Sequence, residues 1–269
     1  MPEAPEVKLF VDKIKKEYSL KVVEKIEVLS GRYLNKPIIG LENIRDKTLI
    51  SCKCKGKFIW FDFGETIIFN TLGMTGSWNS SKTKHSRIKV HFKDDNKLYY
   101  NDIRNFGTFH LKTRVELKQK LQSLGPDMLS CPPNVNDFIS RLRKKDNKNI
   151  CEVLMNQKIV SGIGNYIKAE SLWYSRINPH SFVKDLTDEN LETLYKAVLF
   201  VINKSYKEQG ASIQSYYTFD GNKGTAVSGF VVYGKNKDYH GYNVLKEQTL
   251  DKRTTHWVKE RQTVGGHSG

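Results

Sequence analysis

The chain has 269 residues, of which 38% are hydrophobic and 27% charged, so it can bury a core and form one large or two ordinary domains. No apolar run reaches the roughly 18–20 residues of a membrane span, and the first residues do not resemble a signal peptide. These features exclude a mini-protein and favour an intracellular protein that is neither secreted nor membrane-embedded. The four cysteines form no CxxC pair, so reduced thiols are expected and structural zinc is not.

The charge balance points to a polyanionic partner. Lys and Arg number 44 against 29 Asp and Glu, a net charge of +15 that is spread along the chain. Nucleic acid is the first candidate and an anionic membrane surface the second. A well-solvated basic surface is the alternative, and the abundance of Lys, Asn and Ile suggests A/T-rich coding, which explains part of the lysine excess.

The N-terminal half predicts a leading helix followed by antiparallel strands. Near the start, apolar residues recur at helical spacing and Pro5 suits a first turn. Short β-rich runs follow, and turns at 64–65 and 93–96 join two pairs of them, which predicts a sandwich or barrel. The helical positions are Val7, Phe10, Val11, Ile14 and Tyr18, and the β-rich runs are 20–29, 48–54, 58–63, 66–69, 87–92 and 97–100.

The C-terminal half predicts helices and then a hairpin. Prolines and a glycine at 124–133 indicate a linker, and Thr187 is the expected N-cap of the last helix. The predicted helices are 137–145, 149–157, 165–175 and 191–206, and the predicted hairpin is built from 229–234 and 249–258 around a turn at 238–242. The fold class is therefore α+β.

We divide the chain accordingly into five segments. An N-terminal β-sandwich domain at 1–122 precedes a linker at 123–136 and a helical domain at 137–228. A hairpin at 229–263 and a disordered tail at 264–269 complete the chain.

Pro2 is a candidate nucleophile. Removal of Met1 would leave an exposed secondary amine, and because an α-amino group titrates near ~7.7–8, part of it is unprotonated at physiological pH and can attack a sugar carbon. Glu3 could donate or shuttle a proton. Taken alone, however, a proline after the first methionine is usually without function.

Five short segments carry the strongest signal, because they occur in the order of one family. They are MPEAPEV at 1–7, KGKF at 55–58, LGMTG at 72–76, DIRNFG at 102–107 and QKIVSGIGN at 157–165. Together they resemble the formamidopyrimidine-DNA glycosylase and endonuclease VIII (Fpg/Nei) family, the last one resembling the turn of its helix-two-turn-helix (H2TH) domain. The resemblance implies a DNA glycosylase and AP lyase of base excision repair, with Pro2, Glu3 and Lys57 as catalytic residues.

The resemblance also implies which residues grip DNA phosphates. Taken alone, Lys57 is either a solvated lysine at the end of a strand or a residue that binds phosphate, and the family resemblance favours phosphate binding. Asn165 opens a helix whose N–H groups favour phosphate, although it also suits a cap. Lys158 and Arg253 are the further expected DNA contacts.

Met74, Arg104 and Phe106 match the positions that fill the gap left by the extruded nucleotide. Without the resemblance, Met74 and Phe106 would more often be core residues. The loop departs from the family pattern at Ile103 and Asn105, which leaves its stiffness and the preferred opposite base open.

The C-terminal hairpin departs most from the family. Family members commonly hold this finger with four cysteines on zinc, whereas Tyr239, Tyr242, Val258 and Arg261 occupy these positions here, so no thiolate site can form. The segment resembles the zincless finger of one vertebrate Nei-like glycosylase, in which packing replaces the metal. No metal or cofactor is therefore expected, and the lone histidines His240 and His256 are assigned to the hairpin surface.

Three smaller expectations complete the assignment. Cys52 and Cys54 share a strand face and are expected as buried thiols. Trp173 and Tyr174 are expected in the core, with nucleotide stacking as the alternative. The aromatic and glycine-bounded residues 216–224 are expected to cover the extruded base.

The expected partner is damaged DNA, duplex or single-stranded, bound by a monomer in a basic cleft between the two domains, wherever the genome is kept, in nucleus or cytoplasm. Resemblance to zincless enzymes favours oxidised pyrimidines and hydantoins, with formamidopyrimidines and oxidised guanine as the alternative. A damage-binding module without chemistry remains a second class. A third interpretation, a protein that binds RNA or a membrane surface, is supported by the net charge alone.

Overall fold

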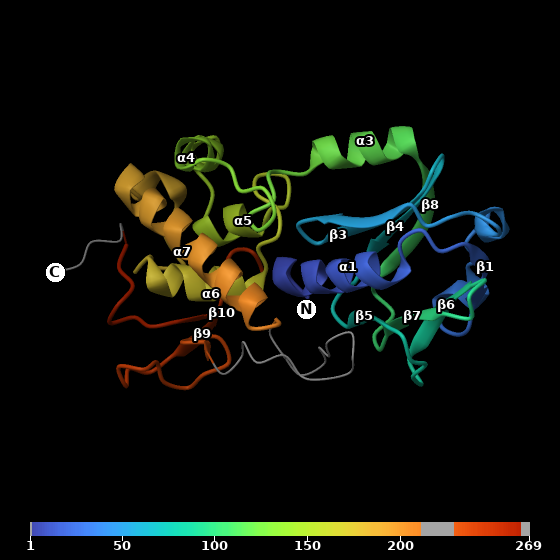
Figure 1. Ribbon diagram of the computed structural model, residues 1–269. Helices are drawn as coiled ribbons and strands as arrows, with labels where there is room; N and C mark the ends of the chain where they lie inside the picture. The colour runs from blue at the N-terminus through green and yellow to red at the C-terminus, as the bar shows by residue number, and fades with distance from the viewer. Residues whose placement is uncertain (1, 211–228, 265–269) are drawn as a thin grey trace. The chain divides into compact units, whose positions relative to one another are not determined.

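The computed structural model describes residues 2–210 and 229–264, and the chain divides into two compact units. Of the described residues, the first unit holds 2–123 and 208–210, and the second holds 124–207 and 229–264 (Figure 1). Across the described ranges, no helix is both long and apolar enough to cross a membrane.

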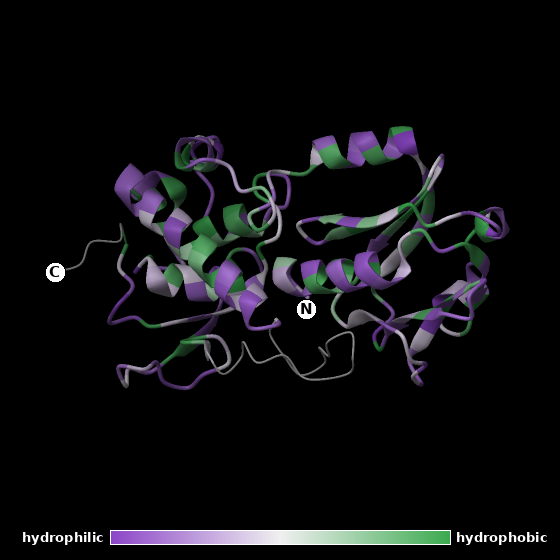
Figure 2. Ribbon diagram, in the orientation of Figure 1, coloured by the Kyte–Doolittle hydropathy of each residue, from purple (hydrophilic) through white to green (hydrophobic). Residues whose placement is uncertain are grey.

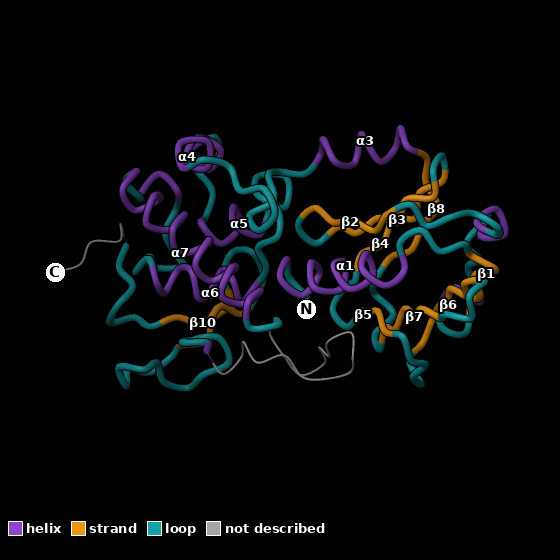
Figure 3. Tube along the Cα trace, in the orientation of Figure 1, coloured by secondary structure: helices purple, strands orange, loops and turns teal. Residues whose placement is uncertain are grey.

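The strands of the first unit (orange in Figure 3) form a sandwich of two four-stranded sheets. Every pair of neighbouring strands is antiparallel. This confirms the sandwich predicted from strand–turn–strand spacing. One sheet has the order β1 (Val23–Val28), β6 (Ser86–Phe92), β7 (Lys97–Asp102), β5 (Gly76–Asn79), and the other β2 (Ser51–Lys55), β3 (Phe58–Phe63), β4 (Thr66–Thr71), β8 (Thr108–Thr113).

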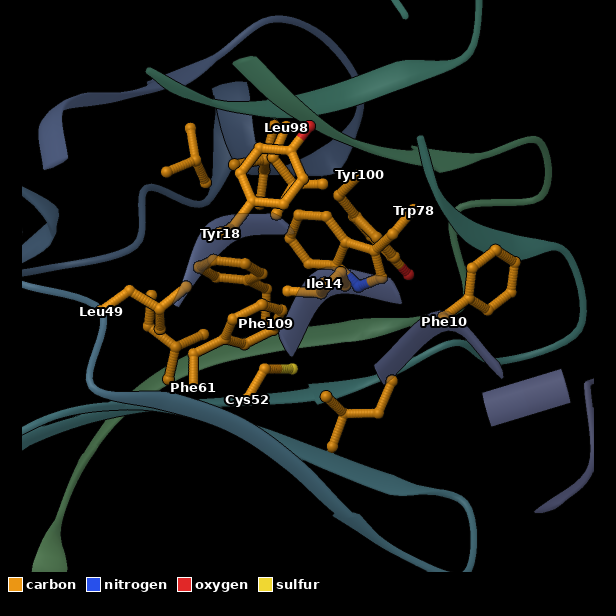
Figure 4. Packing of buried hydrophobic residues seen from close by; sticks show 14 of the residues in the cluster. Phe10, Ile14, Tyr18, Leu49, Cys52, Phe61, Trp78, Leu98, Tyr100 and Phe109 are labelled. Atoms are coloured by element: carbon orange, nitrogen blue, oxygen red, sulfur yellow. The ribbon is translucent and has the colours of Figure 1, made fainter. Parts of the chain in front are cut away.

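Helix α1 (Ala4–Tyr18) packs against β2 and β3 of this sandwich. Hydrophobic and hydrophilic residues alternate along it at helical spacing (Figure 2), and its five predicted apolar positions are all buried. Phe10, Ile14 and Tyr18 enter the core beside Phe61 and Trp78 (Figure 4). Each such side chain contributes about 1.5–3 kcal/mol on burial, so the helix is fixed to the sandwich from its first turn.

Glycines set two tight hairpin turns of this unit. Gly64 has φ +90° in the predicted β3–β4 turn, and Gly56 has φ +57° between β2 and β3. A positive φ at the first turn residue is what a type II′ hairpin requires. The structure also contains α2 (Arg32–Asn35), η1 (Leu41–Ile44) and α3 (Arg114–Ser123), which the sequence did not predict.

The second unit is helical. Thr187 caps the last helix as predicted, because its hydroxyl accepts from the backbone N–H of Asn190. The helices are α4 (Val135–Arg143), α5 (Ile150–Met155), α6 (Asn165–Tyr174), η2 (Val183–Asp185) and α7 (Asp188–Lys207). Residues 124–128 pack within this unit, since Gly125 donates to the Gln157 carbonyl and Met128 to that of Ser161.

The C-terminal hairpin is formed by β9 (Leu245–Gln248) and β10 (Thr254–Trp257). The sequence placed its first strand at 229–234, and that part of the prediction is wrong. The N–H groups of Val231, Val232 and Tyr233 donate to the buried carboxylate of Glu170 at 2.7–2.9 Å instead of entering a β-ladder. A single side chain from α6 therefore satisfies three backbone donors that a strand would have paired.

Candidate nucleic-acid interface

Pro2 and Glu3 lie at the start of α1. The Glu3 backbone N–H donates to the Glu6 carboxylate at 2.7 Å, which fixes the chain where the helix begins. Both Pro2 and Glu3 are buried, so the expectation of an exposed nitrogen at Pro2 is wrong for this form of the chain. Because Met1 precedes Pro2 in this chain, that nitrogen is part of an amide here and becomes an amine only when Met1 is removed.

Lys57 occupies the second position of the tight turn that joins β2 to β3, directly after Gly56. It is half-buried. The turn fixes its backbone at the end of two paired strands of the sheet on which α1 packs.

The three expected gap-filling residues come together on the first unit. The guanidinium of Arg104 lies 4.7 Å from the Phe106 ring centre and donates to the Met74 sulfur at 3.2 Å. Met74 is 39% exposed and Phe106 54%, so neither is the core residue that its chemistry alone suggested. An exposed cluster of two apolar side chains and one cation is suited to contact with nucleobases.

Asp102 holds the two turns that carry this cluster. One carboxylate oxygen accepts from the Gly107 N–H at 2.7 Å, and the other accepts from the Thr75 hydroxyl at 2.5 Å. Thr75 Oγ1 also accepts from the Arg104 N–H at 2.9 Å. Since Asp102 is fully buried, these bonds form a rigid base under exposed side chains.

A second set of contacts anchors the end of the loop. The carbonyl of Gly107 accepts from the Arg32 guanidinium and from the Tyr33 hydroxyl, the latter at 3.2 Å. Arg32 and Tyr33 belong to the unpredicted helix α2. No local pattern in the sequence points to this contact, because the two residues lie more than 70 residues before Gly107.

The structure accommodates both residues at which the loop departs from the family pattern, Asn105 and Ile103. Asn105 has φ +59°, a left-handed geometry that Asn tolerates better than most residues. Ile103 is 47% exposed.

In the second unit, a single glutamine organises the turn before α6. Gln157 accepts from the Gly162 N–H at 2.9 Å and donates to the Ile163 carbonyl at 3.0 Å. Gly162 has φ +106°, which explains the need for glycine. Asn165 then begins the helix, and Lys158 is exposed within the same turn region.

Asn165 reaches the hairpin. Its side-chain amide donates to the Thr254 carbonyl at 2.8 Å, and Thr254 directly follows the exposed Arg253. Two of the expected phosphate contacts, far apart in sequence, thus lie at adjoining elements of one unit. Both can donate hydrogen bonds to an anion, and the positive end of the α6 dipole favours negative charge there.

The hairpin is held by aromatic and polar packing around Trp173. The Arg261 guanidinium lies 4.9 Å from the Trp173 ring, the Tyr239 ring lies 5.0 Å away, and the indole N–H donates to Asp238 at 3.2 Å. Val258 is buried in the same cluster, while Tyr242 is 43% exposed. Among the described residues, no three His, Cys, Asp or Glu side chains form a group that could hold a metal.

The remaining candidate residues are either buried or lie outside the described part of the chain. Cys52 is buried and Cys54 partly buried, and Trp173 is a core residue. Burial lowers the pKa of His256, whose ring packs on Tyr233. Residues 216–224, expected to cover the extruded base, lie outside the described residues, as do 265–269 of the tail.

Comparison with known proteins identifies the family. Residues 1–109 match the formamidopyrimidine-DNA glycosylase N-terminal domain, and residues 124–217 match the H2TH domain of the same enzymes. A formamidopyrimidine-DNA glycosylase of Lactobacillus gasseri is 30% identical over 243 residues, covering 87% of this chain and 88% of the relative. The chain belongs to the formamidopyrimidine-DNA glycosylase family.

A glycosylase of this family from Cytobacillus firmus is 28% identical over 97% of this chain and its own full length. Lactococcus lactis Fpg, solved in complex with abasic-site DNA, superposes with a TM-score of 0.86 at 25% identity and covers 97% of this chain and 100% of its own. The expected family and α+β fold are confirmed. The expected class, a DNA glycosylase with AP-lyase activity in DNA repair, follows from membership in this family.

Proposed function

We propose that this glycosylase is bifunctional and that Pro2 is its nucleophile. After removal of Met1, the Pro2 nitrogen attacks C1′, the glycosidic bond breaks, and the base leaves with a proton. Ring opening, assisted by Glu3, gives a Schiff base between Pro2 and C1′. Loss of a 2′ proton then expels the 3′ phosphate, and a second elimination expels the 5′ phosphate.

The gap-filling cluster carries the proposal. Met74, Arg104 and Phe106 are exposed, Arg104 contacts the other two, and the turns that carry them are held by the buried Asp102. An enzyme that extrudes a nucleotide needs such a wedge, because the unstacked neighbours cost a few kcal/mol unless something fills the gap. Lys57, Lys158, Asn165 and Arg253 grip the phosphates in this proposal.

Damaged DNA is the proposed partner, bound by a monomer at the genome. The relatives are named for formamidopyrimidine, and one Lactococcus lactis complex contains Fapy-dG DNA, which favours formamidopyrimidines and oxidised guanine as substrates. Oxidised pyrimidines and hydantoins are the second candidate, favoured by a finger without cysteines. Excision from matched duplexes that carry one lesion of each class separates the two.

Borohydride trapping on an abasic-site duplex tests the chemistry. The processed enzyme forms a covalent adduct, whereas a damage-binding module binds without one. A form shown by intact mass to retain Met1 serves as the matched control and gives no adduct. Pro2→Gly keeps a primary amine and gives partial trapping, and failure of the processed wild type to trap overturns the proposal.

A further inference from the structure

A buried ion pair joins α6 to the turn of the hairpin. The ammonium of Lys168 lies 2.7 Å from the carboxylate of Asp251, and the side chains are 0% and 4% exposed. Burying two charges carries a large desolvation penalty, which only close pairing and further hydrogen bonds offset. A pair of this kind therefore fixes a geometry more than it adds stability.

The hydrogen bonds that complete the pair lie in the turn itself. Asp251 accepts from the Thr249 hydroxyl at 2.5 Å and from the Arg253 N–H at 3.4 Å. The Thr249 hydroxyl also lies 2.7 Å from that of Thr255, across the hairpin. Thr249 and Arg253 are thus tied directly to one carboxylate, and Thr255 is tied to it through the Thr249 hydroxyl.

The pair is close in sequence to two of the expected phosphate contacts of this unit, Asn165 and Arg253. Lys168 is three residues after Asn165 in α6, and Asp251 is two residues before Arg253. The bond from Asn165 to the Thr254 carbonyl is a second tie between the same two elements. The helix start and the turn are consequently linked on each side of Arg253.

We infer that Lys168 and Asp251 form a positioning pair, which holds the Arg253 guanidinium and the Asn165 amide at the spacing of phosphates on one DNA strand. The inference rests on the proposed function, because it assigns these two residues to DNA. In this hairpin, the ion pair fixes the turn that carries Arg253, a role that a bound zinc ion would share in a cysteine-containing finger. Neither residue touches DNA in this scheme.

A double-mutant cycle tests the pair. Lys168→Met with Asp251→Asn removes both charges at nearly constant volume and keeps an acceptor for Thr249. In the unaltered enzyme, Arg253→Ala weakens binding to a tetrahydrofuran-containing duplex about tenfold, and it reduces the log–log salt slope by about 0.9, the loss of one phosphate contact. In the neutral-pair background we expect Arg253→Ala to weaken binding less than about twofold with almost no change of slope.

A purely structural pair gives another result. Arg253→Ala then has the same tenfold effect and the same slope change in both backgrounds, which overturns the inference. The matched control is the exposed pair Glu192–Lys196 on α7, where Glu192→Gln with Lys196→Met makes the same charge change. In that background, Arg253→Ala keeps its tenfold effect on binding and its change of salt slope.

Folding and function are checked separately. Thermal unfolding shows whether each variant is folded at the assay temperature, and if the neutral pair is not, the whole cycle is repeated at a lower temperature at which all of its variants are folded, with the same criterion. Trapping of the unaltered enzyme on an abasic site tests the proposed function. Normal trapping together with an unchanged effect of Arg253→Ala rejects only the positioning role.

Discussion

The Arg104 guanidinium lies over the ring of Phe106, 4.7 Å from its centre. A contact of this kind at an exposed site is worth about 0.5–1 kcal/mol, enough to favour one arrangement of these two side chains. The proposed wedge is therefore partly organised in the absence of DNA.

Phe106→Ala removes the larger apolar part of this wedge. We expect base excision from duplex DNA to fall about tenfold to a hundredfold, since stacking on one base is worth about 1–3 kcal/mol. Cleavage of a preformed abasic site in single-stranded DNA changes little, because nothing has to be unstacked. Val115→Ala, at another exposed apolar position, is the control. Equal losses on both substrates would contradict the wedge role.

Gly107→Ala tests the rigid base under the loop. An added Cβ would lie 1.7 Å from the Tyr100 hydroxyl and 2.6 Å from the Thr71 carbonyl, so the loop or the strand must move. We expect a loss of unfolding free energy of about 2–4 kcal/mol in denaturant titration. Gly241→Ala has open space around its Cβ and only a strained φ of +88°, so about 1 kcal/mol is expected there.

The cysteines differ in reactivity because burial changes their ionisation. Burial raises the pKa of Cys151 to about 12 and that of Cys52 well above its usual value, while Cys131 is exposed. The thiolate is the reactive form, and at pH 8 only about one Cys151 side chain in ten thousand carries it. A disulfide reagent should label Cys131 rapidly and Cys52 and Cys151 only on unfolding. Cys131→Ser abolishes the fast phase, and rapid labelling of Cys151 in the native protein would contradict its burial.

His256 makes the second unit sensitive to mild acid. Burial first, and then the charges of Lys246 and Lys168, lower its pKa, so the folded state favours the neutral ring. Its contribution to stability is present above the unfolded pKa of about 6.5 and is lost as the pH falls below that value. His256→Phe keeps a ring against Tyr233 and removes the titration. Compared by denaturant titration between pH 7.5 and 5, the wild type should lose more stability than the variant, and parallel losses would argue against this role.

Local patterns in the sequence predicted the elements with strong periodicity. The apolar stripe of α1, the Gly64 turn and the Thr187 cap each depend on neighbours within a few residues, and each is found in the structure. Helix α3 was not predicted, because it buries only Leu117 and its pattern is correspondingly weak.

The parts that could not be predicted depend on long-range contacts. Residues 229–234 have β-like composition, yet Glu170, some 60 residues earlier, captures their N–H groups. The pair of Lys168 with Asp251 spans 83 residues and carries no local pattern. The convergence of Met74 with Arg104 was expected only through the family resemblance, since Met alone more often indicates core.

The manner in which Trp173, Arg261 and Asp238 hold the hairpin has a consequence for its sensitivity to oxidants. Peroxide and hypochlorous acid destroy zinc–thiolate centres by oxidising sulfur, and no sulfur of cysteine exists beyond Cys151 to be attacked. The hairpin proposed to bind DNA therefore carries no thiol whose oxidation could unfold it.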